Sequence, residues 1–264
     1  MNKFLKIAIN ASIEAGKSIM EIYDTNIKVE YKEDYSPLTE ADKRANEVIN
    51  LFLTPTKIPI ISEENKQTDY AIRKTWETCW VVDPVDGTKE FIKRNGEFTV
   101  NIALVTDGKP VLGVIYAPAV KTIYFANVDN NEAFKANLES HDVTVETILK
   151  LAKPLQPKNN NSDKVEIVGS RSHMNVDTLN FVEDLKKEGK NIEIISKGSS
   201  LKFCLVAEGN ADVYPRYAPT MEWDTAAGQA ICNAVGLKVI SKDTNMPLEY
   251  NKENLLNNYF LVSK

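Results

Sequence analysis

Three consecutive apolar runs between Phe98 and Ala126 constrain the fold of this chain more than any other feature of its sequence. The runs are rich in β-branched residues, Asp107-Gly108 separates the first from the second, and Pro118 lies near the next reversal. Short connections of this kind join antiparallel strands. The pattern therefore predicts an antiparallel meander.

Two helices and a strand are expected before the meander. Over residues 3–23, apolar side chains recur at steps of three and four, which predicts an amphipathic helix that covers a sheet. A second helix should begin after Thr39 and end near Leu53, because Pro55 disfavours helix in the residue before it. Residues 58–61 then favour a short buried strand.

The second half of the chain has a different pattern. Residues 137–163 lose the regular alternation and contain a polar, proline-punctuated stretch, so we place a boundary there between domains at 1–140 and 164–264. Beyond it, strands and helices alternate, which is typical of an α/β layered structure. The expected strands are 165–168, 192–195, 211–214, 237–240 and 259–262, and the expected helices are 176–187, 200–209 and one that begins near Asp224.

Composition excludes several classes of protein. With 264 residues, 43% hydrophobic and 26% charged, the chain is typical of a folded globular protein. A net charge of −5 argues against nucleic acid as the main partner, because phosphate-tracking surfaces need a cationic excess.

The sequence also bears on location. Three unpaired-looking cysteines, Cys79, Cys204 and Cys232, favour a reducing compartment. Polar residues interrupt the start of the chain where a signal peptide would be apolar, and no stretch approaches the roughly 20 apolar residues of a membrane span. We expect a cytoplasmic protein, and a peripheral membrane association stays open.

Residues 80–88 (WVVDPVDGT) carry the most specific chemical signal. An apolar run ends in two acids, Asp83 and Asp86, which Pro84 separates and Gly87 follows. Pro84 is expected to stop the strand, and Gly87 to let the backbone approach a ligand, whose phosphate would suit the free N–H groups that follow. For an isolated pair of acids, an Asx-type turn with a helix cap would be the alternative.

Two further acidic segments favour the functional interpretation. Glu63 and Glu64 come directly after the strand expected at 58–61, and Asp224 stands at the head of a helix of small residues. Each alone could be a helix cap. The three segments together predict a cluster of carboxylates.

In combination, these segments have the pattern of the inositol monophosphatase-like sugar phosphatase superfamily, which the sequence resembles over nearly its whole length. The resemblance implies a layered αβαβα sandwich, in which the first half is rich in antiparallel strands and the smaller second half is α/β. It also implies that divalent metals are bound by Glu63, Asp83, Asp86, Asp224 and the carbonyl group of Val85.

The chemistry of these residues agrees with that implication. Two carboxylates about 4 Å apart repel by roughly 4 kcal/mol at an effective dielectric constant near 20, so a cluster of them needs cations. Oxygen ligands without cysteine, in a chain with only two histidines, favour Mg²⁺ or Mn²⁺ over zinc or iron. We expect two or three ions.

A bound metal can activate a water for in-line attack on a phosphate, without a covalent enzyme intermediate. The spacing of Thr39 and Asp42 fits a capping box, in which Asp42 would only close the start of a helix. The resemblance implies instead that Asp42 pairs with Thr88 to activate the water.

The substrate is indicated by a closer resemblance within the superfamily. Residues 87–91, 95–103 and 198–204 are similar to CysQ-type 3′(2′),5′-bisphosphate nucleotidases. Lys89 and Glu90 stand where inositol monophosphatases usually have Thr-Asn. The implied activity is Mg²⁺-dependent hydrolysis of the 3′-phosphate of 3′-phosphoadenosine 5′-phosphate, or of its phosphosulfate, to AMP or adenosine 5′-phosphosulfate and phosphate.

A nucleotide with two phosphates needs cations outside the metal site. The resemblance implies contacts to the nucleotide and its 5′-phosphate from the second half of the chain, by His173, Ser199, Lys202 and Arg216. The phosphate that is cleaved would lie against Glu63, Asp86, Gly87, Thr88 and Asp224. The alternatives are solvated surface charges at Lys202 and Arg216, a loop histidine at 173 and a helix cap at 199.

Other functions stay open at this point. An inositol monophosphatase or a fructose-1,6-bisphosphatase would share the metal ligands, and a nucleotide-sensing protein could use the same site without catalysis. The resemblance also implies sensitivity to Li⁺ and a role in sulfate assimilation. The oligomeric state is not indicated.

Overall fold

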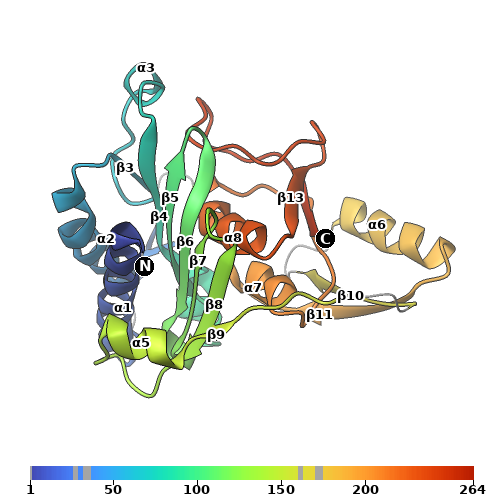
Figure 1. The fold of residues 1–264 in the computed structure, drawn as a ribbon, viewed down its shortest axis with the longest axis horizontal. Coiled ribbons are helices and arrows are strands. Elements are labelled where there is room, and N and C mark those ends of the chain that lie inside the picture. Colours follow the sequence, from blue (N-terminus) through green and yellow to red (C-terminus); the bar gives the residue numbers. More distant parts are fainter. Residues whose placement is uncertain (1, 26–28, 32–36, 160–162, 170–174) are drawn as a thin grey trace.

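A computed structural model describes residues 2–25, 29–31, 37–159, 163–169 and 175–264 of the chain (Figure 1). Its largest sheet has the strand order β3-β4-β5-β6-β7-β8-β9, and every neighbouring pair is antiparallel except β3 with β4. The strands are β3 (Ile60–Ser62), β4 (Thr78–Asp86), β5 (Thr99–Thr106), β6 (Lys109–Ala117), β7 (Thr122–Asn127), β8 (Glu132–Asn137) and β9 (Lys153–Pro154).

The predicted meander is confirmed by β5, β6 and β7. Asp107 and Gly108 connect the first two strands with φ angles of 48° and 72°. Two consecutive positive φ angles suit the right-handed twist of a tight hairpin, which explains the Asp-Gly sequence.

Two helices cover one face of this sheet, with the bounds that the sequence predicts. Helix α1 (Lys3–Tyr23) packs on β5 and β6, and α2 (Glu40–Leu53) packs on α1 and β4. The buried face of α1 includes Leu5, Ile9 and Ile13, which lie four residues apart and form a common core with the sheet.

The opposite face of the sheet is covered by α8 (Glu222–Ala234), next to which α7 (Leu201–Ala207) lies. Small residues permit this close contact: a Cβ atom on Gly113 of β6 would lie 2.5 Å from the carbonyl oxygen of Ala227. Since α8 and α7 share one core cluster with the large sheet, the two halves of the chain are packed together.

Smaller sheets lie beyond α7 and α8. Strands β12 (Tyr214–Arg216), β14 (Phe260–Ser263) and β13 (Lys238–Ser241) are antiparallel, and β10 (Lys164–Gly169) pairs in parallel with β11 (Asn191–Ser196). Helix α6 (Val176–Lys187) forms the outermost layer (Figure 1). The order of layers, helix, sheet, helix, sheet, helix, confirms the predicted αβαβα fold class.

Several elements differ from expectation. Residues 137–163, predicted to be irregular, contain α5 (Val145–Leu151) as well as β9, and the strand expected at 211–214 begins only at Tyr214. These elements are too short for a periodic apolar pattern to be recognised in the sequence. The remaining short elements are β1 (Val29–Tyr31), β2 (Pro37–Thr39), α3 (Tyr70–Arg73), α4 (Thr88–Ile92) and two 3₁₀ turns, η1 (Thr54–Thr56) and η2 (Pro118–Val120).

The division into domains at 1–140 and 164–264 stays a prediction. Strand β9 adds residues 153–154 to the large sheet. Among the described residues, no helix is both long enough and apolar enough to cross a membrane.

Candidate metal centre and active site

An irregularity in β4 brings Asp83 and Asp86 to the same place. Asp83 pairs with Asn101 of β5 and Asp86 with Thr99, so three steps along β4 correspond to two along β5. An extra residue of this kind re-aims the side chains that follow it, which alternation in a regular strand would send to opposite faces. The prediction that Pro84 ends the strand is therefore wrong. Pro84 lies inside β4, within the bulge.

A third acid comes from the second half of the chain. Asp224 lies in the first turn of α8, where one of its carboxylate oxygens accepts a hydrogen bond from the backbone N–H of Met221 at 2.7 Å. One carboxylate oxygen from each of Asp83, Asp86 and Asp224 lies within 4.8 Å of the other two. The structure thus brings together residues that are 141 positions apart (224 minus 83).

The electrostatics of the cluster favour the binding of a cation. Burial, and then the charges of Glu63 and Asp86, hold the pKa of Asp83 well above its usual value of 3.8. Burial and the neighbouring Asp86 raise the pKa of Asp224 to about 7. Two carboxylates at 4.8 Å repel by about 3.5 kcal/mol at an effective dielectric constant near 20. A divalent cation would relieve this repulsion, so the residues fit a metal.

Glu63 and Val85 complete the expected ligand set. Glu63 follows β3 directly, its backbone N–H donates to the carbonyl oxygen of Val82, and its charge acts on both Asp83 and Asp224. The carbonyl oxygen of Val85 is 3.3 Å from the hydroxyl of Thr88. The donor set contains only oxygen, as hard cations prefer.

Asp42 makes the capping contacts and also a contact to Thr88. One carboxylate oxygen accepts hydrogen bonds from the N–H and the hydroxyl of Thr39, which closes the capping box of α2. The other oxygen is 3.2 Å from the hydroxyl of Thr88. Asp42 therefore caps the helix and contacts the second motif at the same time.

A loop in the second half of the chain holds Asp86 through two hydrogen bonds. The backbone N–H of Ser200 donates to the Asp86 carboxylate at 2.6 Å, and the hydroxyl of Ser199 donates to the Asp86 carbonyl oxygen at 2.8 Å. Gly87, at φ = 91°, makes room for this loop: a Cβ atom there would lie 2.1 Å from the Ser199 hydroxyl. The N-cap of α7 is Ser200, so the alternative reading of Ser199 as a cap is wrong.

Two residues that sequence reasoning missed hold the same carboxylate. The side-chain amide of Asn101 donates to Asp86 at 3.3 Å, and the hydroxyl of Thr99 lies 3.5 Å from it. Their alternate positions in β5, opposite the two acids of β4, were the available signal.

A pocket of about 120 Å³ opens beside the acids. Lys202 is only 6% exposed, and its ammonium group donates to the Ser199 carbonyl oxygen at 2.5 Å. Burial lowers the pKa of Lys202 to about 8, although the charge of Asp86 opposes the shift. The residues that line the pocket are Asp86, Gly87, Glu90, Gly198, Ser199, Lys202, Phe203, Tyr214, Arg216, Thr220, Asp224 and Thr225.

Two polar atoms of this pocket lack a protein partner. The Arg216 Nε and the Thr220 hydroxyl are buried and have no hydrogen-bond partner within the described ranges, although an Arg216 Nη donates to the Pro219 carbonyl oxygen at 3.0 Å. Buried polar groups are rarely left unpaired, so these two atoms are exceptions. Thr220 had no signal in the sequence.

Of the predicted site residues, the acids and Thr88 lie together, and Gly87, Ser199, Lys202 and Arg216 line the adjoining pocket. The alternative reading of Lys202 as a solvated surface charge is wrong, because its side chain is buried. His173 lies outside the described residues.

Known proteins are similar to this chain in sequence and in fold. A model of the inositol monophosphatase family matches residues 1–261. The 3′(2′),5′-bisphosphate nucleotidase CysQ of Salmonella typhimurium is 44% identical over 254 residues, which cover 94% of this chain and 95% of that protein. The protein of the same name from Shigella flexneri is 42% identical, with the same coverage.

A solved structure extends the likeness to the fold. The crystal structure of CysQ from Bacteroides thetaiotaomicron, described as a bacterial member of the inositol monophosphatase family, superposes with a TM-score of 0.88 at 49% identity, over 100% of this chain and 97% of that one. With its carboxylate cluster and its match over residues 1–261, this chain belongs to the inositol monophosphatase family.

Proposed function

We propose that this protein is a Mg²⁺-dependent 3′(2′),5′-bisphosphate nucleotidase that removes the 3′-phosphate of 3′-phosphoadenosine 5′-phosphate to give AMP and phosphate. The observation that carries the proposal is the meeting of the Asp83, Asp86 and Asp224 carboxylates beside a pocket with two cationic side chains. The names of relatives that are 42–44% identical over 94% of the chain support it. The phosphosulfate analogue of this nucleotide is a second candidate substrate.

The metal would be held by Glu63, Asp83, Asp86, Asp224 and the carbonyl oxygen of Val85, and we propose two or three Mg²⁺ ions, for which Mn²⁺ could substitute. When bound, the metal supplies positive charge for the phosphoryl group and makes a water more acidic. The donor chemistry supports this choice, since Mg²⁺ prefers carboxylate and carbonyl oxygens.

Asp42 and Thr88 would move the proton of the attacking water. The Thr88 hydroxyl can donate its hydrogen to Asp42. The Thr88 oxygen is then free to accept a hydrogen bond from the water. Asp42 is fixed by its two contacts to Thr39, so it can orient Thr88 without reorganising.

Lys202 and Arg216 would bind the 5′-phosphate, because the metal would act only on the phosphate that is cleaved. Both side chains line the pocket beside Asp86 and Asp224, and the Arg216 Nε has no protein partner in the described ranges. His173 and Ser199 remain candidates for the same role, although the Ser199 hydroxyl already contacts the carbonyl oxygens of Asp86 and Glu97.

We also propose a cytoplasmic location and a small-molecule substrate rather than nucleic acid. All three cysteines are free and buried, which suits a reducing compartment, and the net charge is −5.

The test is a phosphate-release panel with and without Mg²⁺. The substrates are 3′-phosphoadenosine 5′-phosphate, its phosphosulfate analogue, inositol 1-phosphate and fructose 1,6-bisphosphate. We expect Mg²⁺-dependent release with the highest kcat/KM for the bisphosphate nucleotide. A preference for inositol 1-phosphate would overturn the substrate, and nucleotide binding without release would favour a sensing role.

A further inference from the structure

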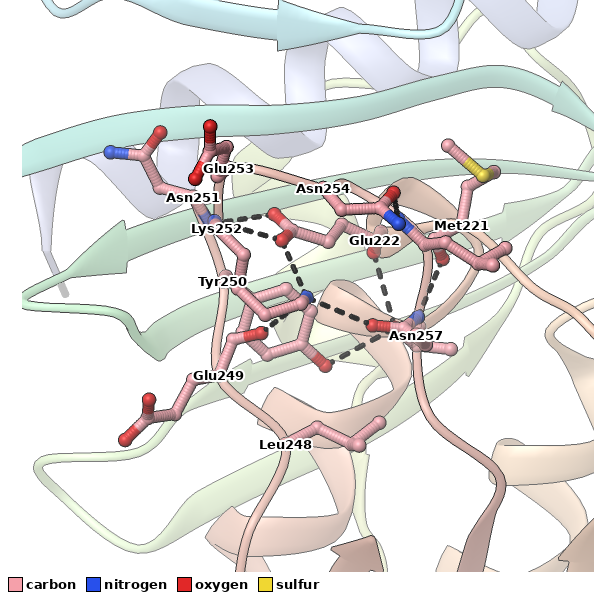
Figure 2. Close-up of polar contacts among 12 residues, drawn as sticks. Met221, Glu222, Leu248, Glu249, Tyr250, Asn251, Lys252, Glu253, Asn254 and Asn257 are labelled. Atoms are coloured by element: carbon pink, nitrogen blue, oxygen red, sulfur yellow. Dashed lines mark hydrogen bonds and ion pairs between the residues drawn. The ribbon is translucent and has the colours of Figure 1, made fainter. Parts of the chain in front are cut away.

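The segment from Leu248 to Asn257 lies against the first turn of α8, the turn that carries Asp224 (Figure 2). We propose that Glu222 and Asn257, through this segment, are positioning residues that set where Asp224 meets the acids of β4. The inference rests on the proposed function in one respect, the assignment of Asp224 as a metal ligand.

Glu222 ties the segment to the helix through its side chain. The carboxylate is fully buried, and it accepts hydrogen bonds from the backbone N–H groups of Asn251 and Lys252 at 2.6 and 3.0 Å and from the Lys252 ammonium group at 2.6 Å (Figure 2). A buried carboxylate with three donors is held in one position. Glu222 stands two residues before Asp224, so this tie fixes the turn directly.

Asn257 holds the same turn on both sides of Asp224. Its side-chain amide donates to the carbonyl oxygen of Met221 at 2.8 Å and to the hydroxyl of Thr225 at 2.9 Å. Its backbone N–H donates to the carbonyl oxygen of Thr220 at 2.8 Å. The residues around Asp224 are thus bound to the segment, while its own carboxylate caps the helix and meets the metal cluster.

The part of the segment that Glu222 holds is also bound to α3, the helix that comes before β4 in the chain. The guanidinium group of Arg73, which is 3% exposed, donates to the side-chain oxygen of Asn251 at 2.7 Å and to the carbonyl oxygen of Lys252 at 3.1 Å. Arg73 ends α3, shortly before β4. The segment therefore contacts both the element before β4 and the start of α8.

Such a connection matters because the acids come from separate elements. Asp83 and Asp86 are fixed relative to each other by one strand, but the position of Asp224 depends on how α8 sits on the sheet. Partners that orient metal ligands typically change metal affinity by roughly 10- to 100-fold when they are removed. We therefore assign Glu222 and Asn257 an effect on metal binding beyond their effect on stability.

The test compares Asn257→Ala and Glu222→Gln with a matched control, Gln229→Leu. The Gln229 amide also holds this segment, donating to the carbonyl oxygen of Leu248 at 3.0 Å, but from further along α8. Melting temperature is measured against Mg²⁺ concentration without substrate, since a ligand of the native state raises it by mass action. Phosphate release from the bisphosphate nucleotide is measured over the same range.

We expect Asn257→Ala and Glu222→Gln to raise the Mg²⁺ concentration for the half-maximal shift about tenfold or more, with activity partly restored at high Mg²⁺. Gln229→Leu should lower the melting temperature without moving that midpoint. An unchanged midpoint in both positioning variants would overturn the inference. If Asn257→Ala does not fold, the milder Glu222→Gln decides. Should the wild type fail to hydrolyse the nucleotide while the midpoints still shift, the proposed function fails and the inference stands.

Discussion

The hydroxyl of Thr88 lies 3.2 Å from a carboxylate oxygen of Asp42, although the two residues are 46 positions apart and belong to different helices. The contact joins the cap of α2 to the start of α4, next to the proposed metal ligands of β4. It is the arrangement that a general base acting through a hydroxyl requires.

Removal of this pair should slow the chemical step. We expect Thr88→Ala and Asp42→Asn to lower kcat by about 10²- to 10⁴-fold, while the Mg²⁺ midpoint in a melting titration changes little. Steady-state kinetics at saturating Mg²⁺ measure the effect. Thr88→Ser, which keeps the hydroxyl, is the control and should retain most of the activity; equal losses in Ser and Ala variants would contradict the role.

Neutralising an acid of the cluster should have opposite effects on stability and activity. Asp83→Asn removes a buried carboxyl group whose charged form Glu63 and Asp86 repel, so the metal-free protein should melt at a higher temperature. The same variant should lose Mg²⁺-induced stabilisation and most phosphate release. Asp129→Asn, at an exposed position, is the control. A metal-free Asp83→Asn protein less stable than wild type would argue against the repulsion.

The stability of the metal-free protein should fall as the pH rises towards about 7. Burial and Asp86 raise the pKa of Asp224 from 3.8 to about 7. Between these values the native state binds a proton that the unfolded chain has released, so raising the pH destabilises the fold. Melting in a chelator from about pH 5.5 to about pH 8 should show this decline and its levelling above about pH 7, and Asp224→Asn should reduce the slope. Identical slopes in the two proteins would contradict the pKa shift.

Lys202 should distinguish a bisphosphate from a monophosphate. We expect Lys202→Ala to raise KM for the bisphosphate nucleotide about tenfold or more, and to affect a 3′-monophosphate less, because only the former has a 5′-phosphate to lose a charge-assisted contact. Lys238→Ala, an exposed lysine of β13, is the matched control. Equal changes in KM for both substrates would show that Lys202 does not bind the 5′-phosphate.

Gly87 should be more sensitive to substitution than a glycine of similar conformation. Gly87 and Gly189 have φ angles of 91° and 82°, but only at Gly87 would a Cβ atom meet another group, the Ser199 hydroxyl at 2.1 Å. Both alanine variants bear the cost of a positive φ, about 1–3 kcal/mol, and Gly87→Ala adds a clash. Urea unfolding should rank Gly87→Ala as the less stable, and adding Ser199→Gly should recover part of the loss.

The parts of the fold that the sequence predicted are those with long periodic patterns. Helices α1, α2 and α6 and the strands of the meander have extended apolar faces, which locate them well. The short elements α5 and β9 present too few residues for a clear periodic pattern. The bulge at Pro84 depends on pairing with β5, which the sequence does not display.

The candidate site divides in a similar way. The acids stand in distinctive local motifs, so their types and positions identify them. Thr99, Asn101, Thr220 and Asn257 act through contacts with distant segments, and nothing in their own neighbourhoods distinguishes them from ordinary polar residues.

The most direct test of the central claim is phosphate release from 3′-phosphoadenosine 5′-phosphate, titrated with Mg²⁺, for the wild type and Asp224→Asn. If the carboxylates of β4 and α8 together hold the metal that the reaction needs, the wild type releases phosphate only with Mg²⁺, and the variant is slower by orders of magnitude at every concentration. Release that does not depend on Mg²⁺, or an Asp224→Asn variant as active as the wild type, would contradict the account.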